Sequence, residues 1–131
     1  MQLSKFTDYA FRSLIYLAKN SKENATVDIL AEELKISTHH LKKVVNKLAK
    51  TEYIISIKGR NGGLRLGVVP EEINLGKVLL LTEENLNIVE CMNELGTCPL
   101  INDRCKLKGI ISNSLSAFVD EMSKYTLKDI I

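Results

Sequence analysis

The chain has 131 residues, of which 45% are hydrophobic and 26% are charged. This composition fits one compact domain or two small units and is too apolar for intrinsic disorder. The longest uncharged stretch of the C-terminal half, residues 109–119, is too short to span a bilayer, and charged residues interrupt the apolar N-terminus, unlike a signal peptide. We therefore expect a cytoplasmic protein that does not enter a membrane.

The net charge of +2 conceals an asymmetry between the two halves of the chain. Residues 1–66 contain 12 Lys and Arg against 6 Asp and Glu, whereas residues 67–131 contain 6 against 10. A basic half joined to an acidic half indicates a unit that faces a polyanion, with a partner-binding or sensor unit attached.

The basic half contains three helical segments. Near-helical spacing of apolar residues predicts a first helix over about residues 7–19, with Thr7 or Asp8 as its N-cap. After a polar connector we expect a short helix whose inward-facing residues are Ile29, Leu30, Ala31 and Leu34. Ser37 then offers the N-cap of a third helix, whose apolar stripe consists of Leu41, Val44, Val45 and Leu48.

A β-hairpin follows the third helix. Residues 53–57 are rich in β-branched side chains and predict a strand, residues 58–63 form a Gly- and Asn-rich turn, and residues 64–66 close the hairpin. Helix, short helix, turn, helix and two-stranded ribbon is the order of a winged helix-turn-helix. We therefore predict a mainly α fold with a small β-hairpin wing, and assign residues 1–68 to a DNA-binding domain.

Residues 69–131 form the second predicted unit. A helix is expected over residues 75–81, an ordered loop over about 84–105, and a long helix over about 105–125. The long helix has more apolar surface than so small a chain can cover, so we expect it to form a homodimer; packing on its own domain is the alternative. Its stripe consists of Leu107, Ile110, Ile111, Ser114, Leu115, Phe118, Val119 and Met122.

The third helix and the hairpin carry the candidate DNA contacts. In a helix-turn-helix the third element enters the major groove of double-stranded DNA with its N-terminal residues nearest the bases, while lysines attract phosphates. An arginine on the wing suits a narrow minor groove. A solvated helix face and an ordinary hairpin are the alternative. The expected contacts are Thr38, His39, His40, Lys42, Lys43, Lys47, Lys58, Arg60, Asn61 and Gly62.

Three cysteines, Cys91, Cys98 and Cys105, are separated by six residues each and include no C-x-x-C pair. This spacing is weak evidence for a zinc finger, and buried structural thiols are its default interpretation. Thiolates also suit an iron–sulfur cluster, and direct oxidation of the thiols is a third alternative. The spacing does not choose among them.

No Ser-His-Asp or Cys-His arrangement, Gly-rich phosphate loop or carboxylate pair with a pocket signature emerges from the sequence, so we expect no enzyme. A rival of a different class is a small redox or electron-transfer protein whose basic half binds an acidic partner.

Four segments resemble the NsrR-like nitric-oxide-sensing transcription repressors, within the winged-helix iron–sulfur regulator family that includes IscR. They are MQLSKFTDYAFR at 1–12, KGRNGGLRLG at 58–67, NIVEC at 87–91 and YTLKD at 125–129. The resemblance implies a bacterial, homodimeric repressor of a palindromic operator, which loses DNA when nitric oxide attacks its iron–sulfur cluster.

The resemblance also implies the ligands of the cluster. They would be Cys91, Cys98 and Cys105, with Asp8 of the partner subunit as the fourth ligand; [4Fe-4S] is favoured and [2Fe-2S] stays open. IscR has a histidine three residues beyond its last cysteine, where this chain has Lys108. Six residues, instead of the expected five, separate Cys98 from Cys105. A sister regulator that senses iron–sulfur supply or redox state is the alternative within the family.

Overall fold

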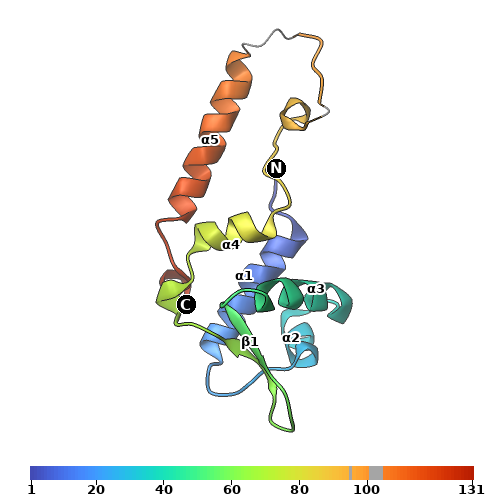
Figure 1. The fold of residues 1–131 in the computed structure, drawn as a ribbon, viewed down its shortest axis with the longest axis vertical. Helices are drawn as coiled ribbons and strands as arrows, with labels where there is room; N and C mark the ends of the chain where they lie inside the picture. The colour runs from blue at the N-terminus through green and yellow to red at the C-terminus, as the bar shows by residue number, and fades with distance from the viewer. Residues whose placement is uncertain (95, 101–104) are drawn as a thin grey trace.

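The computed structural model of the chain describes residues 1–94, 96–100 and 105–131. Five α-helices and an antiparallel two-stranded sheet make up the described chain, which confirms the predicted mainly helical fold with a hairpin (Figure 1). The elements in chain order are α1 (Lys5–Lys19), α2 (Val27–Leu34), α3 (Thr38–Ala49), β1 (Ile54–Ile57), β2 (Gly63–Leu66), the 3-10 turn η1 (Pro70–Glu72), α4 (Leu75–Thr82), η2 (Glu90–Met92), α5 (Lys106–Met122) and η3 (Leu127–Ile130).

Helix α1 begins earlier than its apolar spacing predicts. Ser4 is its N-cap, and the Ser4 hydroxyl accepts a hydrogen bond from the backbone N–H of Thr7 at 3.2 Å. The expectation that Thr7 or Asp8 caps the helix is therefore wrong. Thr7 is fully buried, and Asp8 lies in the first turn, where a carboxylate interacts favourably with the positive end of the helix dipole.

Helices α2 and α3 form the helix-turn-helix. Ser37 caps α3, its hydroxyl accepting from the backbone N–H of His40 at 3.3 Å, and all four residues of the predicted apolar stripe are buried. The prediction for α2 is wrong at Ile29, which is 43% exposed. Adjacent helical residues point about 100° apart. In this two-turn helix the buried positions are Leu30 and Ala31, so Ile29 faces solvent.

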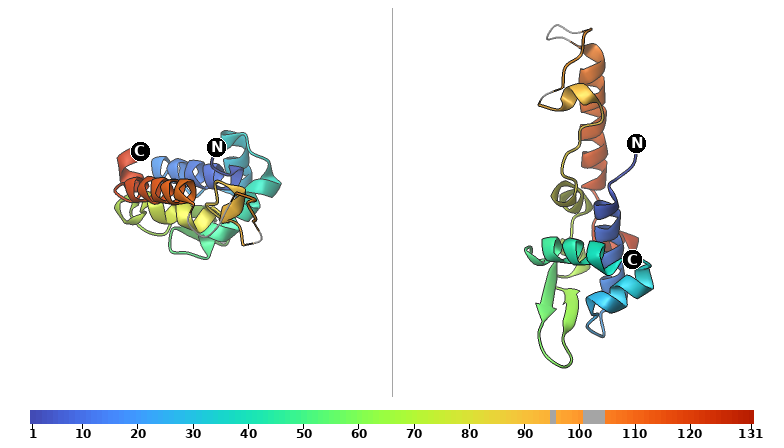
Figure 2. Two further views of the ribbon diagram at one scale, coloured as in Figure 1. Left: turned by 90° about the horizontal axis from the view of Figure 1, so that it is seen from above. Right: turned by 90° about the vertical axis from the view of Figure 1, so that its right-hand side faces the viewer.

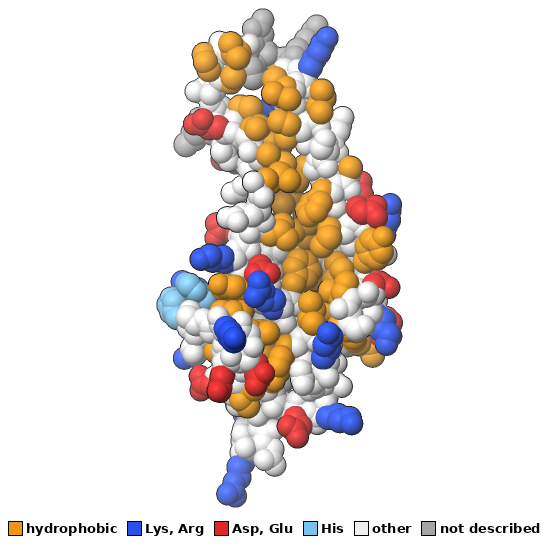
Figure 3. Space-filling view, turned by 180° about the vertical axis from the view of Figure 1, so that it is seen from behind, with side chains coloured by type: hydrophobic (Ala, Val, Ile, Leu, Met, Phe, Trp, Pro, Cys, Tyr) orange, Lys and Arg blue, Asp and Glu red, His pale blue; other side chains and the backbone are white. Residues whose placement is uncertain are grey.

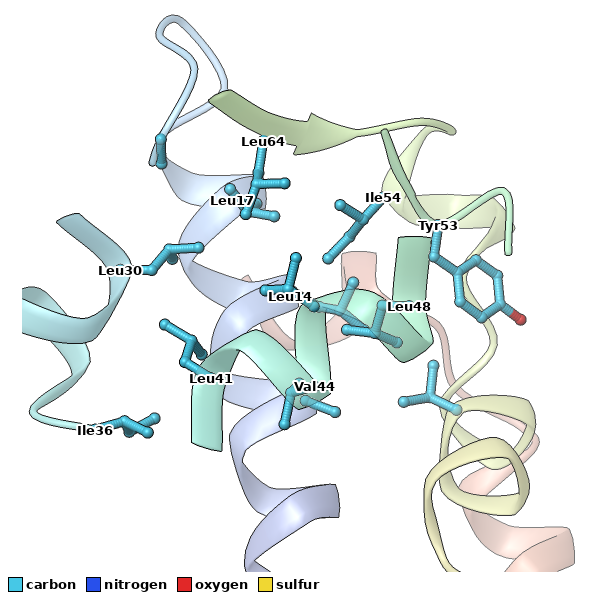
Figure 4. Close-up of a cluster of buried hydrophobic side chains, with 14 of the residues drawn as sticks. Leu14, Leu17, Leu30, Ile36, Leu41, Val44, Leu48, Tyr53, Ile54 and Leu64 are labelled. Carbon is cyan, nitrogen blue, oxygen red and sulfur yellow. The ribbon is translucent and has the colours of Figure 1, made fainter. Parts of the chain in front are cut away.

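The side chains of α1 pack at the centre of the core (Figure 4). Leu14 lies beside Leu48 of α3 and near Ile54 of β1, while Leu17 faces Leu64 of β2. The same core contains three residues from beyond position 68: Ile73, Val78 and Leu127. We call the body formed by α1–α4, the hairpin and η3 the head.

Helix α5 leaves the head and projects from it, as the two further views show (Figure 2). It is shorter than predicted, and none of its residues is buried. It contacts the head at α4, where a Cβ added at Gly76 would lie 1.9 Å from the Ser123 hydroxyl. Apolar side chains run as a stripe along one side of the molecule (Figure 3). The exposed large hydrophobic residues of α5 are Leu107 at 64%, Ile110 at 63% and Phe118 at 41%.

In the described residues, none of the helices is both long and apolar enough to cross a membrane.

The C-terminal residues return to the head, which the sequence patterns do not predict. Thr126 forms a β-bridge with Asn74, and the backbone N–H of Leu127 donates to the Ile73 carbonyl at 2.8 Å. The Leu127 side chain is completely buried in the core. The segment that follows the C-terminal end of α5 is therefore fixed to the head by both backbone and side chain.

Substituting Leu127 with alanine tests this attachment. Leu127→Ala leaves a cavity in a close-packed core, and we expect the free energy of unfolding to fall by about 2–4 kcal/mol. The matched control is Ile130→Ala in the same 3-10 turn, where the side chain is 40% exposed and the expected loss is below about 1 kcal/mol. Urea denaturation followed by circular dichroism measures both. Equal losses in the two variants would contradict the attachment.

Glu83 links the end of α4 to the start of α1. Its carboxylate accepts from the backbone N–H of Ser4 at 2.8 Å, 79 residues away in sequence. Partial burial raises the pKa of Glu83, but hydrogen bonds from Thr7 and Ser4 outweigh it, so the pKa lies below its usual 4.5. The contact between the ionised carboxylate and the α1 N-terminus is thus a stabilising one.

The pH dependence of stability follows from that lowered pKa. The stabilisation is fully present above the pKa of the unfolded chain and is lost as pH falls through the lower pKa of the folded chain. We expect Glu83→Gln to cost about 1 kcal/mol at pH 7 and to flatten the decline in unfolding free energy below pH 4.5. Glu84→Gln, at an exposed neighbouring position, is the control. A steep acid decline that survives in Glu83→Gln would refute the link.

Candidate nucleic-acid face and cysteine loop

The solvent side of α3 carries the predicted groove-facing residues. Burial of the opposite face, formed by Leu41, Val44, Val45 and Leu48, determines which side chains point outward. Thr38 is half-buried, whereas His39, His40, Lys42, Lys43 and Lys47 are exposed. The helix therefore presents three lysines and two histidines on its free side.

The two histidines differ in their surroundings. The His40 ring lies 6.4 Å from the Tyr9 ring of α1, and 5.9 Å from the His39 ring at an interplanar angle of 51°. The His40 ring therefore lies next to Tyr9 of α1, whereas the His39 ring neighbours the His40 ring. Lys47 borders a hollow of about 920 Å³ that Phe6 of α1 and Glu83 also line. The lysine thus lies at the edge of the α3 face that meets the start of α1.

The wing tip presents the remaining predicted DNA contacts. Lys58, Arg60 and Asn61 are exposed and Gly62 is half-buried. Gly59 has a φ of 109°, a value that favours glycine, and its carbonyl accepts from the backbone N–H of Gly62 at 3.0 Å. Because α3 packs against β1, the helix face and the hairpin belong to one head.

The three cysteines lie at the other end of the molecule, around the loop that leads into α5 (Figure 1). Cys91 is in η2, Cys98 is in the loop, and Cys105 is the N-cap of α5, its sulfur accepting from the backbone N–H of Lys108 at 3.4 Å. All three are free thiols and half-buried. Positions 95 and 101–104 of the predicted loop lie outside the described residues.

The donor set, rather than its present geometry, fits an iron–sulfur cluster. Three accessible thiols without a disulfide partner provide the soft ligands that iron–sulfur clusters use. Within the described part of this one chain, no three His, Cys, Asp or Glu side chains lie close enough to share a metal ion. The structure does not bring the cysteines together.

Asp8, the candidate fourth ligand, lies in the first turn of α1. Arg12 holds its carboxylate by a hydrogen bond from Nε to Oδ1 at 3.0 Å and an ion pair between Nη2 and Oδ2 at 2.7 Å. The Asp8 side chain is still 42% exposed, so the carboxylate is accessible from solvent. The sequence patterns do not single out Arg12, Glu83 or Ser4. Of these three residues, Arg12 has a local signal, because its i to i+4 spacing from Asp8 allows the two side chains to pair on one helix face.

Comparisons with known proteins agree with this arrangement. The Rrf2 family, described as "Iron-dependent Transcriptional regulator", matches residues 3–131. The HTH-type transcriptional regulator NsrR of Shouchella clausii is 46% identical over 133 residues, which covers all of this chain and 89% of the relative. The regulator of the same name from Bacillus subtilis is 40% identical and is covered to 90%.

Solved structures share the fold. IscR of T. potens superposes with a TM-score of 0.79 at 19% identity, covering 99% of this chain and 85% of that one. CymR, the global cysteine regulator of B. subtilis, has a TM-score of 0.77 at 24% identity, covering 99% of this chain and 95% of that one. The family match and the NsrR relatives both span essentially the whole sequence. This chain belongs to the Rrf2 family of transcriptional regulators.

Proposed function

We propose that this protein is a homodimeric, DNA-binding transcription repressor that senses nitric oxide through an iron–sulfur cluster. The observation that carries the proposal is the set of three free, half-buried thiols in the loop that joins α4 to α5, in a regulator of this family. The cluster, when bound, supplies iron that nitric oxide attacks. Membership of a regulator family favours this function over an electron-transfer protein.

Two surfaces of the head support DNA binding. The lysines of α3 provide phosphate contacts, and the short polar side chains near its N-terminus suit base edges in a major groove of double-stranded DNA. The wing adds Lys58 and Arg60 beyond the helix. Together they form the basic part of a chain whose second half is acidic.

The exposed stripe of α5 supports homodimerisation. Leu107, Ile110 and Phe118 are each more than 40% exposed on a helix with no buried residue. A second copy of α5 would remove this apolar surface from water, which is favourable by roughly 25 cal/mol per Å². A symmetric pair would also present two α3 helices to the two halves of a palindromic operator.

The cysteine loop joins the head directly at its start and only through α5 at its end. It starts directly after Glu83, which holds the N-cap of α1, and it ends at Cys105, which caps α5. Residues 91, 98 and 105 would hold the cluster, with Asp8 of the partner subunit completing the set. A change in the loop would then move α1 and the α3 helix packed on it, altering the separation of the two recognition helices.

Thiol oxidation is the second candidate, because all three sulfurs are free and half-buried. A sister regulator of iron–sulfur supply or redox state uses the same residues. Cluster content and the response to nitric oxide separate these alternatives from the proposed function.

Anaerobic purification with iron and sulfide counted per chain tests the cluster. We expect stoichiometric iron and sulfide, a visible absorption band that nitric oxide bleaches, and loss of bound DNA on bleaching. Cys91→Ser, Cys98→Ser and Cys105→Ser should each lose the band, because each thiolate is a ligand. Met92→Leu, at a half-buried sulfur side chain beside Cys91, is the control and should keep it. Iron-free wild-type protein with one oxidation-sensitive thiol would favour thiol oxidation instead.

Asp8→Ala tests the fourth ligand. We expect the variant to lose cluster or to bleach faster, because the carboxylate that completes the iron coordination across the dimer is gone. Asp28→Ala, which removes an exposed carboxylate from the first turn of α2, controls for the helix-dipole contribution. Absorption spectra, analytical ultracentrifugation and nitric oxide titrations compare the two. An Asp8→Ala protein that matches Asp28→Ala in all three would eliminate Asp8 as a ligand.

A further inference from the structure

The connector between α1 and α2 is joined to the wing. The backbone N–H of Ala25 donates to the Leu64 carbonyl at 3.0 Å, and the backbone N–H of Leu64 donates to the Ala25 carbonyl at 2.7 Å. Ala25 thus pairs with the side of β2 that β1 leaves free, as a one-residue third strand. Because a two-stranded hairpin alone is marginally stable, this pairing stabilises β2 of the wing against the connector.

Asn24 extends the contact to the wing tip. Its side-chain Nδ2 donates to the backbone carbonyl of Asn61 at 2.9 Å, across 37 positions of sequence. Asn61 directly follows Arg60 and lies outside both strands. A hydrogen bond at this carbonyl holds the peptide segment that carries Arg60, beyond the last paired residue of the hairpin.

The backbone of the wing also approaches the connector too closely for side chains. A Cβ added at Gly63, whose φ is 145°, would lie 3.0 Å from the Ala25 carbonyl and 3.1 Å from the Asn24 Cβ. A Cβ at Gly62 would lie 2.2 Å from the Ile57 carbonyl oxygen. Glycine at position 62 thus permits the tight turn of the tip itself, and glycine at position 63 lets β2 lie against residues 24 and 25.

We propose that Asn24 is a positioning residue for the wing: its hydrogen bond to Asn61 fixes the direction in which Arg60 is presented to the minor groove of DNA. The proposal rests on the DNA-binding function proposed above. A wing already held in one direction loses less conformational entropy when Arg60 enters a groove, so the same contact yields a higher affinity. Asn24 itself need not touch DNA.

The experiment compares Asn24→Ala with Asn20→Ala in the full chain, purified anaerobically. Asn20 is a matched control, since its Nδ2 donates to the Tyr16 carbonyl at the same distance of 2.9 Å, but at the C-cap of α1 rather than to the wing. The probe is the duplex that the wild-type protein selects from a random-sequence library. We expect Asn24→Ala to weaken binding by about threefold to tenfold, the scale of one hydrogen bond, and Asn20→Ala to leave it unchanged.

A double-mutant cycle with Arg60→Ala decides whether Asn24 acts through the wing. If it positions Arg60, the penalty of Asn24→Ala disappears in the Arg60→Ala background, because the positioned group is absent. Additive penalties, or equal penalties for Asn24→Ala and Asn20→Ala, overturn the proposal.

Backbone ¹⁵N relaxation of the free protein provides a readout that is independent of DNA. We expect Asn24→Ala to lower the order parameters of residues 60–62, and Asn20→Ala to leave them as in the wild type. Unchanged order parameters in Asn24→Ala overturn the proposal. If the wild type selects no duplex or Arg60→Ala binds normally, DNA contact by the wing is refuted, and the relaxation data still decide whether Asn24 holds the tip.

Discussion

The buried face of α1 is the constraint on which the rest of the structure depends. Ala10, Leu14 and Leu17 are at most 2% exposed, and α1 contacts α2, α3, α4, β2 and η3. Protein interiors are packed as densely as organic crystals, so a helix enclosed in this way moves only together with its neighbours. Helix α3, the wing, the start of the cysteine loop and the segment that follows α5 are therefore all held by contacts with α1 and its neighbours.

The free face of the same helix bears Asp8 and Arg12. One side of α1 is thus fixed in the core, while the other presents a carboxylate held by a hydrogen bond and an ion pair from Arg12. A new partner for that carboxylate would act on the whole head rather than on one side chain. The free-energy change that such a partner must supply to alter DNA binding is small, because a tenfold change in DNA affinity corresponds to about 1.4 kcal/mol.

Local patterns in the sequence predict α3 best, since its N-cap and its apolar stripe are adjacent signals for one helix. They fail at Ile29, because a two-turn helix has too few positions for periodicity to choose its buried face. They also miss Leu127 and the bond from Asn24 to Asn61, whose partners are 54 and 37 positions away. Such contacts depend on how the elements pack, and a single sequence carries no periodic signal for them.

The same limit applies to the candidate site. The spacing of the cysteines indicates that they share a loop, and the structure locates that loop at the end of α5 far from the head, but without gathering the three sulfurs in one chain. The cysteine spacing could not indicate how the loop is connected to the head, which is directly through Glu83 and, at the other side, through α5 and Leu127. Both connections depend on long-range contacts.

The contacts of Leu127 and Glu83 with the head differ in strength, and this difference indicates which of them a rearranged cysteine loop would break first. Beyond the C-terminal end of α5, Leu127 is buried in the core and paired by its backbone, so releasing it requires partial unfolding of the head. At the start of the loop, the Glu83 carboxylate holds the N-cap of α1 by hydrogen bonds at a half-buried position, and such bonds contribute only about 1 kcal/mol each. A rearrangement of the cysteine loop would therefore loosen the Glu83 contact first. The α1 N-terminus, four residues from Asp8, is the point at which the loop can act on the head while the core stays intact.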